Sequence, residues 1–470
     1  MFDDVENKII LAVSSTLQRR RDLCLLCIFF IHCVFIILAG YYLGKLNPDS
    51  TYYLGIATRI SEDFNFNMSF LYNCKQQFFS HYPLGYPFLI AFISKITNLT
   101  VFWSSKILNC LVIGLILILI KQLFNKSAVV LALVTFHYNF MEMSHYTMSE
   151  VTFLGAILLL MYSFLKITHN RESIWFVIFF LSMTMIPFIR YIGIYIYLFI
   201  FIITCISYLR DEINYIKVKK IAILCGFSIS LYIIYLCINF YLTGHITGYT
   251  RKYLSELSGE NYLILNFFEN FFRNMNFLWI QWYYTAILFG VLIFLIKHFR
   301  IRLRPLTQTQ LFLILSAITY LFVFAVIKAL FISTINDFNA RILIPVVFPL
   351  TLALVDYFYK HIRLSVIMFL LVISSLNLTR FISYNIQVDQ PFYKNEDNVL
   401  KKYSQVPSNS LIIEGHPYLN YLRKDVEIIY KYNINVMGLI ENEDEFIFRV
   451  KACDYDQIYF DSGEEIQKIN

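Results

Sequence analysis

The run LCLLCIFFIHCVFIILAGYYL, residues 23–43, decides the class of this protein. It is long enough to cross a hydrocarbon core of about 30 Å as a single helix. Three arginines at residues 19–21 precede the run, and the stretch NPDSTYY, residues 47–53, follows it. The run is longer than the apolar region of a signal peptide, and no small-residue cleavage site follows it. It therefore predicts an uncleaved first membrane span with a cytoplasmic N-terminus.

Runs of the same kind recur along the 470 residues, of which 58% are hydrophobic and only 15% are charged. Soluble domains have a charged fraction of about 25%. The composition therefore indicates a mostly α-helical, polytopic membrane protein with about 11 transmembrane helices. These spans are expected near residues 23–43, 101–120, 128–140, 150–165, 174–189, 191–208, 221–242, 278–296, 310–330, 342–358 and 364–380.

Lysines and arginines are concentrated in alternate loops between the predicted spans. Short basic loops stay on the cytoplasmic side of a membrane. The alternation places the loops 44–100, 141–149, 244–277 and 331–341 on the exterior side, together with the C-terminal tail. From Asp389 onward the chain has 9 Lys/Arg against 15 Asp/Glu. The basic excess therefore belongs to the membrane part and does not indicate binding of nucleic acid.

The tail beyond residue 383 differs from the rest of the chain in composition. Its strand-like pieces, separated by polar turns, lie at 410–413, 426–430 and 457–460. We therefore predict two domains. These are a multi-span transmembrane domain, residues 1–383, and a small exterior α/β domain, residues 384–470.

The long first exterior loop, residues 44–100, is expected to carry the chemistry and to contain two helices of its own. Residues 52–64 are compatible with an amphipathic helix lying at the membrane interface. The segment PFLIAFISKIT, residues 87–97, is apolar but too short to span, so it is expected to lie on the membrane or dip into it.

Asp49 is the first candidate for a catalytic residue, because it opens this exterior loop. A carboxylate at the membrane surface, beside lipid headgroups, is placed to take the proton of an acceptor hydroxyl. Aspartate in a Pro-Asp-Ser-Thr turn is also a common helix cap, and this alternative explains the residue equally well. The two roles are compatible with each other.

A second carboxylate, Glu150, begins a predicted span at the end of the stretch MEMSHYTMSE, residues 141–150. It is placed to orient an acceptor or to ligate a metal together with His145. The alternative is a residue of the first helical turn, where the helix dipole favours a carboxylate. For Glu142, in the same stretch, solvation at the membrane interface is the preferred interpretation.

Arg190 and Arg341 are cations at the edges of apolar stretches. A charge there is costly unless it faces a wet cavity or an anion, and arginine binds phosphate through paired hydrogen bonds. Snorkelling of the side chain to the interface is an equal alternative for Arg190. A pair with Asp337, four residues earlier on a helix, is the alternative for Arg341.

Three side chains of the first exterior loop complete the candidate site. His81 and Tyr82 precede Pro83 and are candidates for contact with a phosphate or a sugar hydroxyl, although an ordinary surface histidine is the simpler explanation for His81. Tyr53, four residues after Asp49, is added as a candidate substrate-binding residue.

Several classes of protein are excluded or disfavoured by missing patterns. The sequence contains no Gly-rich phosphate loop, no Walker pattern and no HExxH motif, which argues against nucleotide-driven transport and metalloprotease chemistry. A transporter or lipid flippase remains the main alternative to an enzyme, although the repeated halves typical of transporters are absent from the sequence. A polytopic assembly factor without catalytic activity, with Asp49 as a helix cap only, is the third.

Taken in order, the motifs resemble those of the GT-C membrane glycosyltransferases, and in particular the branch of the aminoarabinose transferase and the protein O-mannosyltransferase-like proteins. The resemblance covers most of the chain. It is carried by the following motifs: NPDSTYY (47–53), HYPLGYP (81–87), MSE (148–150), RYIG (190–193), NFYLTG (239–244) with TG (247–248), and ARILIP (340–345).

The resemblance implies an inverting transferase of the extracytoplasmic face, in a membrane such as the bacterial inner membrane. Such an enzyme takes a hexosyl or pentosyl group from a polyprenyl or dolichyl monophosphate and passes it to a hydroxyl of a lipid, glycan or protein. By this similarity Asp49 matches the acidic residue of the first loop, and Glu150 matches a second acidic site. Arg190 and Arg341 become candidates for holding the lipid phosphate. A divalent cation is compatible with the reaction but is not required by it, and no metal ligand is assigned.

The chain departs from the family pattern at Tyr82-Pro83-Leu84. Some relatives have a basic residue followed by two prolines at this point, and the basic residue contacts the phosphate. Tyr82 takes its place here, with His81 beside it. The resemblance therefore carries over no phosphate contact from this loop.

Overall fold

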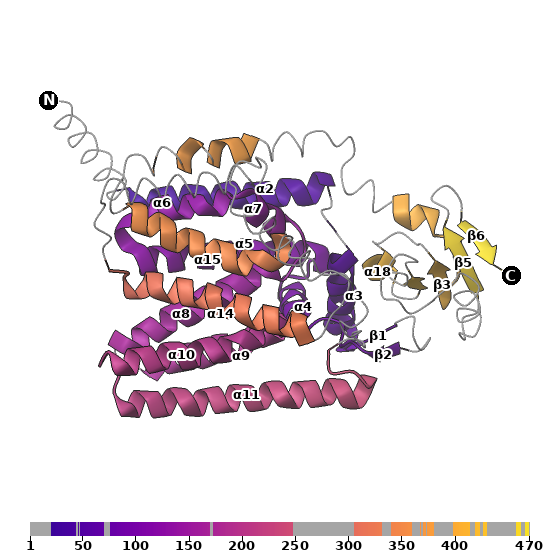
Figure 1. Cartoon of the computed structure of the whole chain (residues 1–470). Coiled ribbons are helices and arrows are strands. Elements are labelled where there is room, and N and C mark those ends of the chain that lie inside the picture. Colours follow the sequence, from indigo (N-terminus) through magenta and orange to yellow (C-terminus); the bar gives the residue numbers. More distant parts are fainter. Residues whose placement is uncertain are drawn as a thin grey trace.

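The computed structural model describes the greater part of the chain. The described residues are 20–43, 46, 48–69, 76–169, 173–247, 305–330, 340–359, 367, 370–372, 374–379, 398–413, 419–423, 426–429, 457–461 and 466–469. Figure 1 shows that long, roughly parallel helices form the body of the protein, with a small sheet beside one end of them. The long helices are α2 (Arg21–Leu43), α5 (Val101–Phe124), α8 (Glu150–His169), α9 (Ser173–Ile189), α10 (Tyr195–Leu209), α11 (Tyr215–Thr243), α14 (Gln308–Leu330) and α15 (Ala340–Tyr359).

Within these parts of the chain, seven helical segments are long and apolar enough to cross a membrane, and α9 is a shorter apolar helix. Their positions agree with the spans predicted from the sequence. The predicted run 278–296 lies outside the residues that the structure describes, and 364–380 lies only partly within them. The total of eleven spans therefore stays a prediction.

The predicted span 128–140 is different in the structure, where it is divided into short pieces. These are η1 (Asn125–Ser127), α6 (Ala128–Ala132), η2 (Leu133–Phe136) and α7 (Tyr138–His145). The hydroxyl of Thr135 donates to the carbonyl of Ala132 and also lies 2.8 Å from Nε2 of His32 on α2. Hydroxyls bonded back to their own helix bend it. The polar residues of this run thus interrupt a helix that its hydropathy alone would predict.

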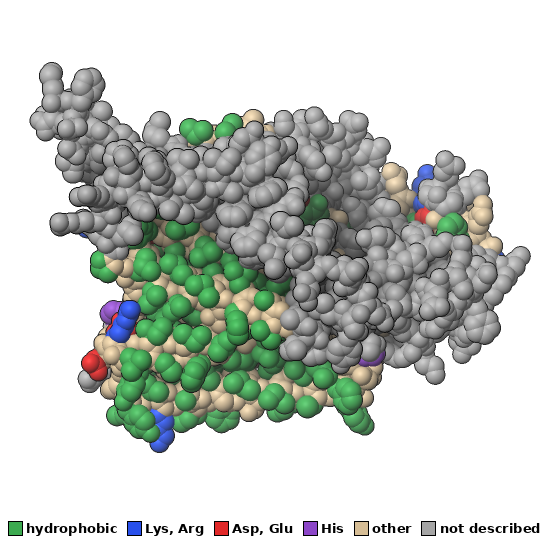
Figure 2. All heavy atoms as spheres, viewed as in Figure 1, with side chains coloured by type: hydrophobic (Ala, Val, Ile, Leu, Met, Phe, Trp, Pro, Cys, Tyr) green, Lys and Arg blue, Asp and Glu red, His purple; other side chains and the backbone are tan. Residues whose placement is uncertain are grey.

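The basic loops that were predicted to share one side of the membrane meet at one end of the helices, as far as the structure describes them. Lys121, after α5, lies 3.0 Å from Asp22 at the start of α2. Lys217, at the start of α11, donates to the carbonyl of Ile167 at the end of α8 over 2.6 Å. Figure 2 shows a hydrophobic helical face between this charged edge and the opposite end.

The chain between α2 and α5 forms α3 (Pro48–Asp63), the strands β1 (Asn67–Ser69) and β2 (Gln76–Phe78), and α4 (Gly85–Thr97). Both helices predicted for the first exterior loop are therefore present. β1 and β2 pair antiparallel. On α4, Phe88, Phe92 and Ile96 are exposed and follow one another at the spacing of a single helical face. Such a face suits a helix lying on a membrane.

The C-terminal part contains a four-stranded sheet in the order β4-β3-β5-β6. Its elements are β3 (Ser410–Ile413), α18 (Leu419–Leu422), β4 (Val426–Ile429), β5 (Gln457–Asp461) and β6 (Ile466–Ile469). β3 pairs parallel with β4 and β5, and β6 pairs antiparallel with β5. Three of the strands match the predicted ones. The fourth was missed because IQKI is a short piece with little hydrophobic signal. The domain boundary near residue 384 lies outside the described residues and stays a prediction.

Candidate active site

Asp49 lies in the first turn of α3, one residue after the helix begins at Pro48. Proline suits the first position of a helix, and a carboxylate in the first turn is favoured by the helix dipole. Asp49 is also engaged by residues far away in the chain. The hydroxyl of Tyr82 donates to Oδ1 over 2.5 Å, and Nη1 of Arg341 pairs with Oδ2. Its carboxylate therefore belongs to a tertiary cluster of charges.

Glu150 is fully buried at the start of α8. Its Oε1 lies 2.5 Å from Nη1 of Arg190 and also pairs with Nε of Arg341. Its Oε2 has no hydrogen-bond partner among the parts of the chain that the structure describes. One oxygen thus holds two guanidinium groups, and the other remains for a further donor.

Arg341 is the residue that joins the two carboxylates, because it contacts Asp49 and Glu150 at the same time. This position differs from the simple pair with Asp337 considered above, although Asp337 itself lies outside the described residues. Arg190 contacts Glu150 and lies 6.0 Å from the ring centre of Phe153. The cluster contains two cations and two anions, so it is close to neutral, and only 16% of Arg190 and 24% of Arg341 is exposed.

Aromatic side chains form one wall of this charged cluster. The rings of Tyr53 and Tyr82 lie 4.9 Å apart, and Tyr86 packs edge-on against Tyr53 at 5.0 Å. The hydroxyl of Tyr53 lies 3.2 Å from Oγ of Ser149, next to Glu150. His81 packs against the ring of Tyr82 at 4.3 Å. All seven residues selected from the sequence therefore gather around the same few side chains.

The two tyrosines nearest the carboxylates keep their protons over the whole neutral range. Burial raises the pKa of Tyr82 well above its ordinary value, and the negative charge of Asp49 raises it further. Burial also raises the pKa of Tyr53, with a further contribution from the charge of Glu150. Both hydroxyls therefore keep a proton that they can donate at neutral pH.

The loop that carries His81 and Tyr82 is held by hydrogen bonds to residues that were not selected individually from the sequence. Tyr191 donates to the carbonyl of Ser80 over 2.7 Å, and the backbone N–H of Leu84 donates to the hydroxyl of Tyr235 over 3.3 Å. Asn239 of α11 donates in turn to the hydroxyl of Tyr191. Tyr191 and Asn239 stand in two of the motifs quoted above, but their spacing gives no sign that they meet.

Two glycines allow the backbone around Arg190 to pack closely. A Cβ on Gly85, at the start of α4, would lie 2.5 Å from the carbonyl oxygen of Phe188. A Cβ on Gly193, in η3 (Tyr191–Ile194), would lie 2.7 Å from the carbonyl of Ile186. Both distances are shorter than a real Cβ contact. The end of α9 is therefore held between two glycines, which fixes the position of Arg190 relative to the loop of Tyr82.

We predict that Gly193→Ala lowers the free energy of unfolding by about 1–3 kcal/mol, because the added methyl group must displace backbone atoms. Gly226→Ala in α11 is the matched control, because a Cβ there meets nothing within 4 Å. The control should leave stability unchanged or raise it by up to about 1 kcal/mol, as alanine favours helices. Thermal unfolding of both variants in detergent measures the difference, and equal midpoints would contradict the prediction.

The metal site considered for Glu150 and His145 has no support in the geometry. Nδ1 of His145 contacts the carbonyl of Met141, within its own helix. Among the residues that the structure describes, no group of three or more His, Cys, Asp or Glu side chains could hold a metal ion.

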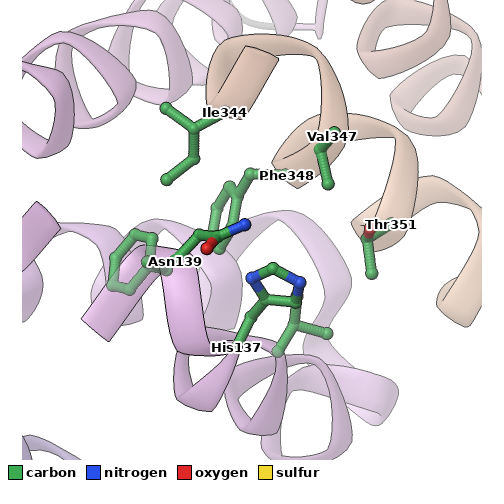
Figure 3. Close-up of a pocket in the computed structure, with 8 residues that line it drawn as sticks. His137, Asn139, Ile344, Val347, Phe348 and Thr351 are labelled. Atoms are coloured by element: carbon green, nitrogen blue, oxygen red, sulfur yellow. The ribbon is translucent and has the colours of Figure 1, made fainter. Parts of the chain in front are cut away.

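A small pocket lies close to the charged cluster but does not include it. Its lining residues come from the η2–α7 segment and from α15, beginning one turn after Arg341. They are Val134, His137, Asn139, Phe140, Ile344, Val347, Phe348 and Thr351. Figure 3 shows His137 and Asn139 facing the α15 side chains across it. None of the four charged residues lines this pocket, so the candidate site is defined by the ion pairs instead.

No protein-family model and no curated protein matches the sequence. Solved structures do match. The chain is similar to ArnT from Cupriavidus metallidurans bound to undecaprenyl phosphate, with 11% identity and a TM-score of 0.54 over 97% of this chain and 93% of that one. It is also similar to the Archaeoglobus fulgidus oligosaccharyltransferase in its apo form, with 11% identity and a TM-score of 0.52 over 93% and 69% of the two chains.

A third similar structure is the oligosaccharyltransferase AglB of the same archaeon in complex with an inhibitory peptide and a dolichol-phosphate. Its identity is 12% and its TM-score 0.52, over 94% of this chain and 70% of that one. At such low sequence identities, structural similarity establishes the fold only. The activity has to be inferred from the residues of the site. The fold expected from the ordered motifs is confirmed: this chain has the GT-C fold of polytopic membrane glycosyltransferases.

Proposed function

We propose that this protein is an inverting glycosyltransferase that moves a sugar from a polyprenyl-phosphate donor to an acceptor hydroxyl at the exterior face of the membrane. The observation that carries the proposal is the contact of Arg341 with both Asp49 and Glu150, with Arg190 on the same oxygen of Glu150. A carboxylate able to act as base is thereby placed beside two cations able to bind a phosphate.

The bonds of the proposed reaction assign these roles. The acceptor oxygen forms a bond to the anomeric carbon while the bond from that carbon to the phosphate oxygen breaks on the opposite face. Asp49 takes the proton of the acceptor hydroxyl. The products are the glycosylated acceptor and polyprenyl monophosphate, whose phosphate has gained one negative charge. Arg190 and Arg341 stabilise that developing charge, which exists in full only as the bond breaks.

In the structure both guanidinium groups are already paired with carboxylates. A donor phosphate would compete with these carboxylates for the arginines. Turning of Arg341 toward the phosphate would release Oδ2 of Asp49, so donor binding itself would make the base available. Glu150, which is fully buried and pairs with Arg190 through Oε1, would keep Arg190 in place during this exchange.

The similar structures support the lipid-linked donor. The ArnT structure contains undecaprenyl phosphate, and one AglB structure contains a dolichol-phosphate and a peptide. Undecaprenyl phosphate and dolichol-phosphate each combine a long isoprenoid chain with a phosphate. For the present chain we extend the proposal to a multi-pass protein of the bacterial inner membrane. The loops of Asp49 and Glu150 and the C-terminal sheet then lie on the periplasmic side, with the acceptor a lipid, a glycan or a protein.

The test is a donor panel. Purified protein in detergent is incubated with radiolabelled polyprenyl-phosphate sugars and a mixture of lipid and peptide acceptors, and the release of polyprenyl phosphate is followed. Release with one donor supports the transferase and names its sugar. Folded protein that releases nothing from any donor would overturn the proposal and favour a transporter or flippase.

We expect Tyr82→Phe to lower kcat by about 10-fold, because its hydrogen bond orients the carboxylate of Asp49. This is the low end of the effect of a hydrogen bond to a charged group, which contributes about 1.5–3 kcal/mol. The raised pKa means that Tyr82 stays protonated through neutral and moderately alkaline pH. Its contribution to stability is complete below pH about 10, its ordinary pKa, and is lost only as pH rises through the raised value. The pH–rate profile between about pH 6 and 9.5 should therefore have the same shape in the variant and the wild type.

The control for this variant is Tyr162→Phe, in the second half of α8, where the ring contacts Lys166 and no substrate group is expected. Its kcat should equal that of the wild type. A change in the alkaline limb of the profile on Tyr82→Phe would show that Tyr82 titrates during turnover, contrary to the expectation.

A further inference from the structure

We propose that Lys106 and Asn109 of α5 act as positioning residues for the transfer reaction, by clamping the turn that delivers Ser149 and Glu150 to the site. The inference rests on the proposed function for its effect on rate, while the clamp itself is a property of the fold. Neither residue was a candidate from the sequence, because both lie inside the predicted span 101–120.

The ammonium group of Lys106 is almost completely buried, with 1% of the residue exposed. Its Nζ donates to the carbonyl of His145, the last residue of α7, over 2.6 Å, and lies 3.4 Å from Oγ1 of Thr147. It also lies 4.8 Å from the ring centre of Phe102. The cation thus sits against the carbonyl end of α7, where the helix dipole favours a positive charge.

Asn109 follows Lys106 by three residues and lies on the same face of α5. It is fully buried, and its Nδ2 donates to the carbonyls of Ser144 and Tyr146 over 2.8 and 2.9 Å. Between them, Lys106 and Asn109 reach three consecutive carbonyls. The hydroxyls of Ser105 and Thr147, 2.7 Å apart, add a third link between α5 and the same turn.

These contacts meet a definite need of the turn between α7 and α8. The last carbonyls of a helix have no partners within it, and buried carbonyls without partners are costly. In the segment 146–149 the chain leaves α7 and enters α8, whose first backbone bond runs from Phe153 N–H to the carbonyl of Ser149. Side chains of α5 therefore supply hydrogen bonds that the backbone of the turn cannot make for itself.

The clamp ends directly at the candidate site. Ser149, at the end of the clamped turn, contacts the hydroxyl of Tyr53, and the next residue, Glu150, holds Arg190 and Arg341. A displacement of this turn therefore moves the carboxylate of Glu150 and disturbs its contacts with the two arginines, as well as the contact of Ser149 with Tyr53. Misplacement of reacting groups by about 1 Å can lower a rate by about 100-fold.

An ionisable side chain inside an apolar helix also indicates a specific role. Lysine within a membrane span is costly and is retained where it meets a partner or a functional need. The helix α5 contains a second lysine, Lys121, at its opposite end, where it pairs with the exposed Asp22. Lys121 therefore provides a comparison within the same helix, because Lys106 contacts the turn before Glu150 and Lys121 lies at the opposite end.

The test compares Lys106→Met, which keeps an unbranched side chain only one atom shorter and removes its donor, with Lys121→Met as the matched control. Hydrogen exchange followed by mass spectrometry reports the opening of residues 144–150 without any need for activity. We expect faster exchange of this segment in Lys106→Met and wild-type exchange in Lys121→Met. Unchanged exchange in Lys106→Met would overturn the clamp. Asn109→Ala serves the same comparison if Lys106→Met fails to fold.

The effect on reaction rate is measured by a double-mutant cycle with Glu150→Gln. Lys106→Met should lower kcat by about 10- to 100-fold, and Lys106→Gln, which keeps a donor, should recover part of the loss. In the Glu150→Gln background, Lys106→Met should lower kcat by less than about 3-fold. The effects of two residues on kcat are not additive in free energy when one acts through the other. If the two substitutions lower kcat independently, so that their factors multiply in the double variant, Lys106 has only a structural role and the positioning proposal is overturned. If wild type releases no donor phosphate at all, the proposed function fails, and the exchange comparison decides the clamp alone.

Discussion

Asp49→Asn should lower the rate of sugar transfer by about 1,000-fold, within the range of 10²–10⁴ that a positioned general base contributes. Asparagine keeps the shape of the side chain and can still accept the hydrogen bond from Tyr82. It cannot accept the proton of the acceptor hydroxyl. Release of polyprenyl phosphate by the purified variant, measured with the donor found for the wild type, gives the size of the loss.

The control for this experiment is Asp63→Asn at the other end of α3, on an exposed residue. It should keep wild-type activity. Circular dichroism and gel filtration of both variants establish that the fold is intact. Full activity of Asp49→Asn would reduce Asp49 to a residue that stabilises the start of α3 and would remove the base from the proposed reaction.

Arg341→Gln should be the most destabilising substitution in the site. It removes the cation that lies between Asp49 and Glu150 and leaves only Arg190 for the buried carboxylate. Loss of one partner from a buried ion pair costs about 3–5 kcal/mol, and because 24% of Arg341 is exposed we expect the lower end, about 3 kcal/mol. Donor binding should weaken as well, because one of two phosphate-binding cations is missing.

A second substitution distinguishes this explanation from general damage to the fold. In the double variant Arg341→Gln with Asp49→Asn, the carboxylate that loses its cation is gone as well, so part of the lost stability should return while activity stays absent. The control Arg21→Gln removes a pair with Asp22, whose side chain is 67% exposed, at the other end of the helices and should cost at most about 1 kcal/mol. Thermal unfolding of the four proteins gives the comparison. A double variant no more stable than Arg341→Gln alone would contradict the ion-pair explanation.

Hydropathy was sufficient to place most of the long helices, because a membrane span satisfies its own backbone hydrogen bonds and needs only length and apolar side chains. It failed at residues 128–140, where Thr135 bonds to its own helix and to His32 of a distant one. It also hid Lys106, because one lysine changes little in the mean hydropathy of a long apolar run. Lys106 was nevertheless visible in the sequence as a single charged residue inside a predicted span, and a search for such residues would have found it.

The sequence by itself determined that this chain spans a membrane and which loops carry its basic residues. It also determined which charged and aromatic side chains stand at the edges of the apolar runs. These properties follow from composition and local order. Only the tertiary structure decided that Arg341 lies between Asp49 and Glu150, the latter 191 residues away, and that Lys106 and Asn109 hold the turn before Glu150. Such contacts depend on which helices pack side by side, and an ion pair or a carbonyl cap between distant segments leaves no periodic trace in either of them.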